Sequence, residues 1–384
     1  MILRNALFTW GLVLAVPVCA VSAEGDLAKN LAIVRGVGVK GEGHAKATAA
    51  AKALAQSSAA ELPAILAAMD GCSVLAENWL RGIAEGVAQK QVGGKLPVAE
   101  LEKFLAQTKH SPRARRLAYE FVAGVDDSAE KRLIPTLLND PSLELRRDAV
   151  ALALADAAKV EDKKAAQAAF HKAFSAARDN DQIKAAADKL KELGETVDLA
   201  THYGFLQTWQ IIGPFDNTGD KGWDVAYPPE AKVDLVAKYP GLKGEIGWKE
   251  ATGKDDFGMI DLTKVLDKHK GAIAYASTEF ISEKDQQVDL RLGSYNAHKI
   301  WLNGEELTAN HVYHAGQQID QYLTQGKMKK GKNAILLKIC QNEQTEAWAQ
   351  SWQFQFRICD TIGTAILSQD RPSAKTAFLP AIRR

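Results

Sequence analysis

Three short segments in the second half of the chain combine aromatic rings with side chains that form hydrogen bonds. A flat ring stacks on the C–H face of a sugar, and nearby carboxylates, amides or imidazoles bond the hydroxyls. The candidate residues are Asp216, Asn217, Trp223, Asp224 and Tyr227 in the first segment, His311, Tyr313 and His314 in the second, and Glu343 and Trp348 in the third. They predict a carbohydrate-binding site if the segments meet in space. The alternative is that Trp223 and Trp348 only close one end of a β-structure.

The same segments contain groups that metal ions use as ligands. His311 and His314 are three residues apart, but zinc needs further ligands that no familiar spacing supplies here. Asp216, Asp220 and Asp224 could hold a calcium ion through their oxygens, although the EF-hand pattern is absent. We therefore expect surface histidines and no cofactor, and we leave calcium open.

Sequence motifs of common catalytic sites are absent. The chain has no Gly-x-Ser-x-Gly, no His-Glu-x-x-His, no phosphate-binding loop and no dinucleotide fingerprint. Two carboxylates such as Glu343 and Glu346 could hydrolyse a glycoside only at a separation of roughly 5 to 10 Å, which sequence does not determine. We expect a non-catalytic protein, with an unrecognised hydrolase as the open alternative.

The beginning of the chain has the pattern of a secretory signal. Arg4 is followed by an apolar run over residues 6–18, and residues 21–23 are small enough for cleavage. The run is shorter than the ~20 residues that span a bilayer, so we expect cleavage near Glu24. A retained anchor, or a lipid on Cys19, is the alternative. The expected location is periplasmic or secreted, with no later transmembrane span.

The charge balance argues against a nucleic-acid partner. The chain has 48 basic and 47 acidic residues, and one of the basic residues, Arg4, lies in the predicted signal. The mature chain would therefore carry no formal net charge, whereas nucleic-acid binders are usually basic.

Three cysteines would remain after cleavage, which leaves at least one thiol free. A hairpin centred near Glu346 would place Cys340 opposite Trp352 rather than opposite Cys359. We therefore expect Cys72, Cys340 and Cys359 to be buried apolar thiols rather than a disulfide framework.

Residue composition divides the chain near residues 203–206. Six of the eight tryptophans lie after residue 205, whereas residues 24–201 are rich in Ala, Leu, Lys and Glu. The latter residues favour helices, and aromatic residues favour half-buried strands. Apolar spacing predicts helices over residues 61–69, 75–89, 98–107, 112–122, 129–138, 143–158, 161–177 and 181–193.

A weak repeat runs through the helical half. Residues 111–118 align with residues 142–149 at an offset of 31, and the offset drifts further along the chain. Residues 140–150 resemble the second helix of a HEAT repeat, in which a turn Asp and a basic residue six positions later form a ladder. Asp140 and Arg146 have this spacing. Stacks of this kind mostly present surfaces to other proteins, and an irregular helical bundle is the alternative.

The second half has the pattern of short antiparallel strands. Predicted strands cover residues 206–212, 258–262, 273–280, 287–292, 298–302, 305–307, 334–339 and 352–358. In the last of these, Trp352, Phe354, Phe356 and Ile358 alternate with polar residues, which is typical of a half-buried strand. Asn303-Gly304 predicts a type I′ hairpin turn. Such strands with glycine turns predict a β-sandwich.

The order of motifs in this half resembles a known family of sugar-binding domains. Lys299-Ile-Trp-Leu-Asn-Gly304, Lys330-Gly-Lys-Asn333 and Trp352-Gln-Phe-Gln-Phe-Arg357 follow one another. They resemble the galactose-binding-like jelly roll that precedes the catalytic barrel in many β-glycosidases. With its HEAT-like half, the whole chain resembles exported proteins of planctomycete-type bacteria. The resemblance implies binding or scaffolding rather than catalysis, and calcium is common in the jelly-roll family.

These expectations describe a multidomain α plus β protein. The expected parts are a signal peptide over residues 1–23, a HEAT-like α-α stack over 24–203, a galactose-binding-like antiparallel β-sandwich over 205–365, and a tail over 366–384. We expect a helical scaffold that can dock a protein partner, and a jelly roll that binds a carbohydrate or glycoconjugate. The alternative is an envelope structural or assembly protein that acts only through protein–protein contacts.

Overall fold

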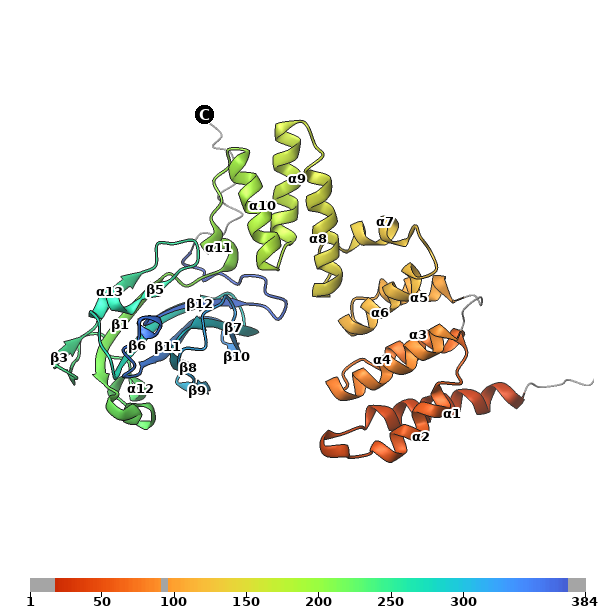
Figure 1. Ribbon diagram of the computed structural model, residues 1–384, viewed down its shortest axis with the longest axis horizontal. Coiled ribbons are helices and arrows are strands. Elements are labelled where there is room, and N and C mark those ends of the chain that lie inside the picture. The colour runs from red at the N-terminus through yellow and green to blue at the C-terminus, as the bar shows by residue number, and fades with distance from the viewer. Residues whose placement is uncertain (1–17, 91–95, 372–384) are drawn as a thin grey trace, which may run out of the picture. The chain divides into compact units, whose positions relative to one another are not determined.

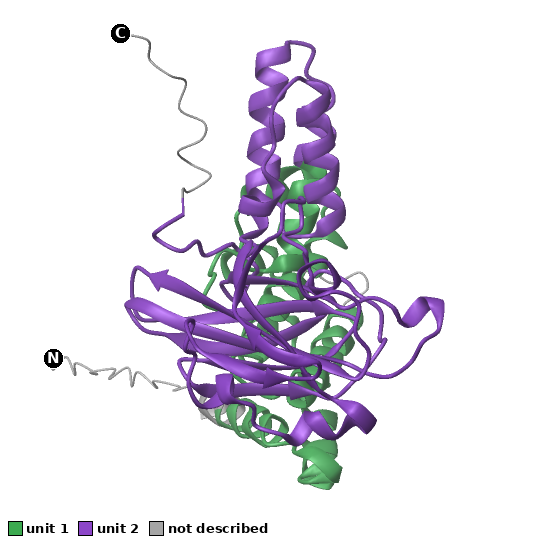
Figure 2. Ribbon diagram, turned by 90° about the vertical axis from the view of Figure 1, so that its left-hand side faces the viewer, with its two compact units in different colours: residues 1–152 green, residues 153–384 purple. Residues whose placement is uncertain are grey.

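The computed structural model describes residues 18–90 and 96–371 (Figure 1). The chain divides into two compact units, Met1–Leu152 and Ala153–Arg384, which Figure 2 shows in different colours. This division falls inside helix α8 (Leu143–Ala157), so the helices after α8 belong to the same unit as the strands. The predicted change from helices to strands occurs where expected, because α11 (Leu199–Tyr203) is followed by β1 (Thr208–Asp216).

Most of the predicted signal and of the predicted tail lies outside the described residues. The last residues of that signal form the start of α1 (Val18–Arg35). No helix within residues 18–90 and 96–371 is long and apolar enough to cross a membrane.

The first unit consists of helices joined by short turns. In chain order they are α1 (Val18–Arg35), η1 (Val39–Gly41), α2 (His44–Leu54), η2 (Ala59–Glu61), α3 (Leu62–Ala67), α4 (Val74–Gln89), α5 (Val98–Leu105), α6 (Pro112–Ala123), α7 (Ala129–Leu133), η3 (Ile134–Leu137) and α8. Consecutive helices pack as pairs, α1 with α2, α3 with α4 and α5 with α6. Their apolar faces share one core, which includes Leu62, Leu80 and Leu117.

Local capping sets many of the helix ends, and the predicted helices end within a few residues of the observed ones. The Ser73 hydroxyl accepts a hydrogen bond from the Ala76 amide (3.2 Å) at the start of α4. Ser111 precedes Pro112, which opens α6. Helices α1 and α2 were not predicted, because small alanines dominate α2 and leave little apolar periodicity to detect.

A buried ion pair joins α6 to the turn before α8. The guanidinium of Arg115 donates two hydrogen bonds to the Asp140 carboxylate, at 2.7 and 2.5 Å, and both side chains are buried. Arg115 Nε also donates to the carbonyl of Leu105 (2.7 Å). Arg146 Nε donates to the backbone carbonyl of Asp140 (2.7 Å). The Asp140 carboxylate thus bonds Arg115, the arginine that aligns with Arg146 at the sequence offset of 31.

The second unit begins with α9 (Lys163–Ala176), α10 (Asn180–Glu192) and α11, and continues into strands. The strands after β1 are β2 (Lys238–Gly241), β3 (Gly244–Gly247), β4 (Lys249–Thr252), β5 (Ile260–Asp261), β6 (Ala272–Ser282), β7 (Gln286–Ser294), β8 (Ala297–Leu302), β9 (Glu305–Asn310), β10 (Tyr322–Met328), β11 (Gly331–Gln341) and β12 (Gln353–Cys359). Short helical turns η4 (Thr218–Asp224), α12 (Pro228–Ala231), α13 (Leu262–Leu266) and η5 (Ala347–Ala349) lie between them.

Two antiparallel sheets pack face to face. The larger sheet has the order β4-β1-β6-β11-β8-β9, the smaller has the order β10-β7-β12-β5, and β2 and β3 form a separate pair. The shared core contains the predicted inward residues Trp352, Phe354, Phe356 and Ile358. Asn303 (φ 53°) and Gly304 (φ 85°) form the predicted turn between β8 and β9. The α plus β class is therefore confirmed.

The last two strands, whose pairing the sequence left open, do not form a hairpin. β11 pairs with β6 and β8 in the larger sheet, whereas β12 pairs with β7 and β5 in the smaller sheet. Cys340 on β11 and Cys359 on β12 are buried free thiols, and Cys72 is a half-buried one. The strand β10 was not predicted, because Gly326 interrupts its alternation. A Cβ there would lie 2.8 Å from the end of the Leu290 side chain, so a larger residue would have to push that side chain aside.

A second apolar cluster covers the outer face of the larger sheet. Phe215, Tyr275 and Leu336 belong to it, and they alternate along their strands with residues of the shared core. The segment between β1 and β4 packs onto this face through Trp223, Tyr227, Val233, Tyr239, Ile246 and Trp248. This segment contains the first group of candidate site residues.

A buried lysine ties that segment to the sheet. Lys338 lies in the middle of β11, and its ammonium donates to the carbonyls of Trp223 (3.0 Å) and Val225 (2.8 Å) and to Glu230 Oε1 (2.9 Å). The Tyr275 hydroxyl donates to the same Glu230 oxygen. All three hydrogens of the ammonium therefore have acceptors, which is what a buried charge requires.

Candidate functional site

The three candidate segments come together at one end of the larger sheet. We call them loop A (residues 217–227), loop B (residues 311–321) and loop C (residues 342–352). The strands before loops A and C both end opposite Ala272 of β6, since Asp216 and Gln341 each pair with it. Loop B joins β9 to β10.

Loops A and B are joined through Asp220. One carboxylate oxygen accepts a hydrogen bond from the Tyr313 hydroxyl (2.6 Å), and the other lies 2.7 Å from Nε2 of His311. Asn217 Nδ2 donates to the Tyr313 hydroxyl oxygen (3.1 Å). Burial, together with the hydrogen bond to Asp220, raises the pKa of Tyr313, so its hydroxyl stays protonated and acts as the donor.

Loop C is joined to both other loops. Glu343 Oε2 accepts a hydrogen bond from the Gly219 amide of loop A (3.0 Å). Nε2 of His314 in loop B lies 3.0 Å from Oδ1 of Asn342. The His314 ring meets Trp348 edge-on, with centroids 5.1 Å apart and planes at 88°. The three loops therefore form one connected network.

The two loop tryptophans have different environments. Trp223 is only 8% exposed, and the His311 ring stacks on it at 4.3 Å with planes 2° apart. The Lys299 ammonium lies 4.9 Å from the same ring. Trp348 is 60% exposed. Trp223 is therefore packed under the His311 ring, whereas Trp348 presents its ring to solvent.

Two further candidates also have structural partners. The ring of Tyr227 packs 4.7 Å from Phe215, and its hydroxyl donates to the carbonyl of Asp216 (2.5 Å). The Asp216 carboxylate accepts hydrogen bonds from the hydroxyl (2.6 Å) and the amide (2.9 Å) of Thr218, which lower its pKa. Asp224 is exposed.

The loop carboxylates do not converge on a shared ion. Asp216 faces Thr218, whereas Asp220 faces His311 and Tyr313. Across residues 18–90 and 96–371, no three His, Cys, Asp or Glu side chains are placed to hold a metal.

Sequence reasoning missed the residue that holds loop A in place. Lys338 is the single charged residue in the apolar run 334–340, and a lysine in the middle of a buried strand signals buried acceptors. Its partners are more than a hundred positions away, so sequence did not identify them.

Comparison with known proteins yields little for this chain. No family model matches it, and no curated protein matches it. Among solved structures, it is similar to β-glucosidase from Kluyveromyces marxianus in two crystal structures. The glucose complex gives 13% identity and a TM-score of 0.19 over 23% of this chain and 11% of the other. The second structure gives 12% identity and a TM-score of 0.25 over 40% and 16%. Likeness at this level does not define a common fold.

Proposed function

We propose that this is an exported, non-catalytic binding protein that holds a carbohydrate at the end formed by loops A, B and C. The observation that carries the proposal is the exposed ring of Trp348, which lies beside His314 where the three loops are bonded together. An indole offers a flat apolar face to the C–H groups of a pyranose, and removing both surfaces from water favours stacking.

The surroundings of Trp348 suit such a ligand. Glu343, Gln344 and Glu346 are exposed on the same loop and can bond sugar hydroxyls. The backbone beneath the indole is fixed, since Lys270 Nζ (2.7 Å) and Gln341 Nε2 (3.2 Å) both donate to the carbonyl of Ala349. A loop that is already ordered loses less conformational entropy when a ligand binds.

The finer description of the fold is part of this proposal. The two face-to-face antiparallel sheets support a galactose-binding-like jelly roll. The paired helices and the buried bond from Arg115 to Asp140, between aligned segments, support a HEAT-like stack. A stack of this kind serves as a scaffold that docks a protein partner. Export rests on the signal-like pattern of residues 1–23.

Replacing Trp348 tests the carbohydrate site directly. A glycan array identifies the sugar that the complete chain binds best, and calorimetry then measures its affinity. We expect Trp348→Ala to weaken binding at least about tenfold, which corresponds to about 1.4 kcal/mol, because the stacking face is removed. The ring is exposed, so the thermal unfolding temperature should stay the same.

The matched control is Phe257→Ala, which removes another exposed aromatic ring, 41% accessible, from a different loop. This variant should bind the sugar as the parent does. Sugar binding that survives Trp348→Ala contradicts the site. A chain that binds no glycan favours the envelope structural or assembly protein that acts only through protein–protein contacts.

A further inference from the structure

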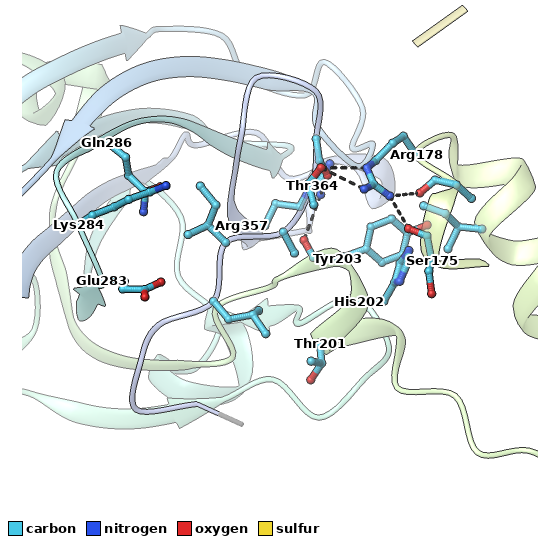
Figure 3. A pocket seen from close by; sticks show the side chains of 16 residues that line it. Ser175, Arg178, Thr201, His202, Tyr203, Glu283, Lys284, Gln286, Arg357 and Thr364 are labelled. Carbon is cyan, nitrogen blue, oxygen red and sulfur yellow. Dashed lines mark hydrogen bonds between the residues drawn. The ribbon is translucent and has the colours of Figure 1, made fainter. Parts of the chain in front are cut away.

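A cavity of about 590 Å³ lies within the second unit, and none of its lining residues belongs to loops A, B or C (Figure 3). Its walls come from the ends of α9 and α11, the turn between β6 and β7, and the segment 363–367 that follows β12. Small-molecule sites typically measure about 300–1,000 Å³, so this cavity has room for an organic ligand.

Hydrogen bonds hold the walls of the cavity in place. Arg178 donates to the carbonyls of Ser175 (2.9 Å) and Ala177 (2.7 Å) at the end of α9, and to the Thr364 hydroxyl at 3.1 and 3.2 Å. Figure 3 shows these bonds, which link a helix to the segment after β12. Arg357 donates to the Asp320 carboxylate (2.6 and 2.5 Å). The cavity is therefore formed before any ligand arrives.

Two polar side chains in the cavity have hydrogen-bonding capacity to spare. Within the described part of the chain, neither the His202 ring nor the Tyr203 hydroxyl has a hydrogen-bond partner, although His202 packs on Phe174 at 3.9 Å. Burial, and then the charges of Arg178 and Arg357, lower the pKa of His202 to about 4. Burial raises the pKa of Tyr203 to about 12. At neutral pH both groups are uncharged and each can donate a hydrogen bond.

The electrostatic field at this end of the cavity favours negative charge. The guanidinium groups of Arg178 and Arg357 disfavour a proton on His202 and favour an anion beside it, and the Asp320 carboxylate that Arg357 bonds offsets part of that positive charge. The ammonium of Lys284 adds positive charge to the wall, and the carboxylate of Glu283 offsets part of it. The remaining wall includes the apolar side chains of Ile183, Ile366 and Leu367.

We propose that this cavity binds a small amphipathic organic anion. Its acidic group accepts hydrogen bonds from Tyr203 and His202, and its apolar body lies against Ile183, Ile366 and Leu367. The site is independent of the carbohydrate site, so either proposal can fail alone.

Two fluorescent probes that differ in charge test the proposal on the complete chain. They are 8-anilinonaphthalene-1-sulfonate, which is an anion, and N-phenyl-1-naphthylamine, its neutral counterpart. We expect one sulfonate molecule to bind per chain, at least about tenfold more tightly than the amine. Tyr203→Phe keeps the ring and removes one donor to a charged group, so the sulfonate should bind about ten- to a hundredfold more weakly. The control Tyr239→Phe removes a hydroxyl elsewhere in the unit and should change nothing.

A blocking variant separates this cavity from other apolar surface. Ser175 is exposed at the cavity wall, and Ser175→Trp places an indole there while keeping the carbonyl that Arg178 bonds. With an unchanged circular dichroism spectrum, this variant should lose sulfonate binding. The proposal would be overturned if the parent protein bound no sulfonate or bound both probes equally well. It would also be overturned if sulfonate binding persisted in Ser175→Trp or was unchanged in Tyr203→Phe.

Discussion

The helical unit and the β-containing unit each bury a cationic side chain, and they use it differently. Arg115 bonds Asp140, which is 25 positions away, and so joins α6 to the turn before α8. Lys338 bonds residues 108 to 115 positions away and so holds the segment between β1 and β4 against the larger sheet. In the helical unit the buried charge joins residues that are close in the sequence. In the sheets it decides where a distant loop lies, and that loop carries part of the candidate site.

Replacing Arg115 should have the largest effect. Arg115→Met leaves the Asp140 carboxylate buried without its partner, and we expect a loss of about 3–5 kcal/mol in the free energy of unfolding. Urea unfolding followed by circular dichroism measures the loss. Hydrogen exchange should show faster exchange in α5 to α8 and little change in the strands.

The control for this change is Arg113→Met. Its side chain is 49% exposed and makes one contact with Glu77 at 3.2 Å, so the loss should be under about 1 kcal/mol. Equal losses in the two variants would mean that burial of the ion pair does not determine its contribution to the stability of the helical unit.

Replacing Lys338 should have the second-largest effect on stability. Lys338→Met leaves two carbonyls without their donor and removes the positive charge beside Glu230, which keeps only its bond from Tyr275. We expect a loss of about 3 kcal/mol, the lower end for a broken buried pair. The loss is smaller because the Glu230 side chain is 14% exposed and can be partly hydrated. Hydrogen exchange should quicken in residues 217–231 while α1 to α6 keep their protection.

Lys332→Met on the same strand is the matched control. Its ammonium bonds Glu279 at the surface, and the side chain is 70% exposed, so little stability should be lost. If loop A exchanges no faster in Lys338→Met than in Lys332→Met, the contrast between the units does not hold.

Acidification should lower the free energy of unfolding of the β-containing unit through His298. This histidine is buried on β8, and burial lowers its pKa to about 4. Between the unfolded value of about 6.5 and pH 4 the unfolded chain binds the proton more tightly. The free energy of unfolding should therefore fall as pH falls, by about 1 kcal/mol per pH unit from this residue.

His298→Leu should remove the contribution of this histidine to the pH dependence of the free energy of unfolding. The half-buried His202, whose pKa is also lowered to about 4, acts in the same direction and remains in the variant. Urea unfolding at pH 7, 6 and 5 measures the slope, and NMR titration of the ring protons gives the pKa directly. A His298 ring that titrates near 6.5 would contradict the prediction.

The smallest effect on stability is expected at Asp220, where the loops meet. Its side chain is 41% exposed, so Asp220→Asn should cost less than about 1 kcal/mol. Binding of the glycan should nevertheless weaken, because His311 and Tyr313 lose the carboxylate that joins loop B to loop A. Asp188→Asn on α10, which removes another exposed carboxylate from an ion pair (with Lys184, 2.8 Å) outside the three loops, is the control and should change stability little and leave binding unchanged.

The comparison of the units also explains which predictions from sequence succeeded. Helix α6 begins at Pro112 after Ser111, and the turn at Asn303-Gly304 forms, because caps and tight turns depend on adjacent residues. The inward face of β12 was predicted for the same reason, since alternation along one strand is local. The sequence left the pairing of β11 and β12 open, because strand pairing depends on residues far apart in the chain.

The sequence by itself determined the helical and strand-forming halves, the positions of most elements and the residue types available for a sugar site. The tertiary structure decided that Trp223 is covered by His311 whereas Trp348 is exposed, and that Asp220, Glu343 and His314 join three loops. The physical reason is distance along the chain. Propensity, capping and alternation act over a few residues, whereas these contacts join residues 28 to 124 positions apart and exist only once both sheets have formed.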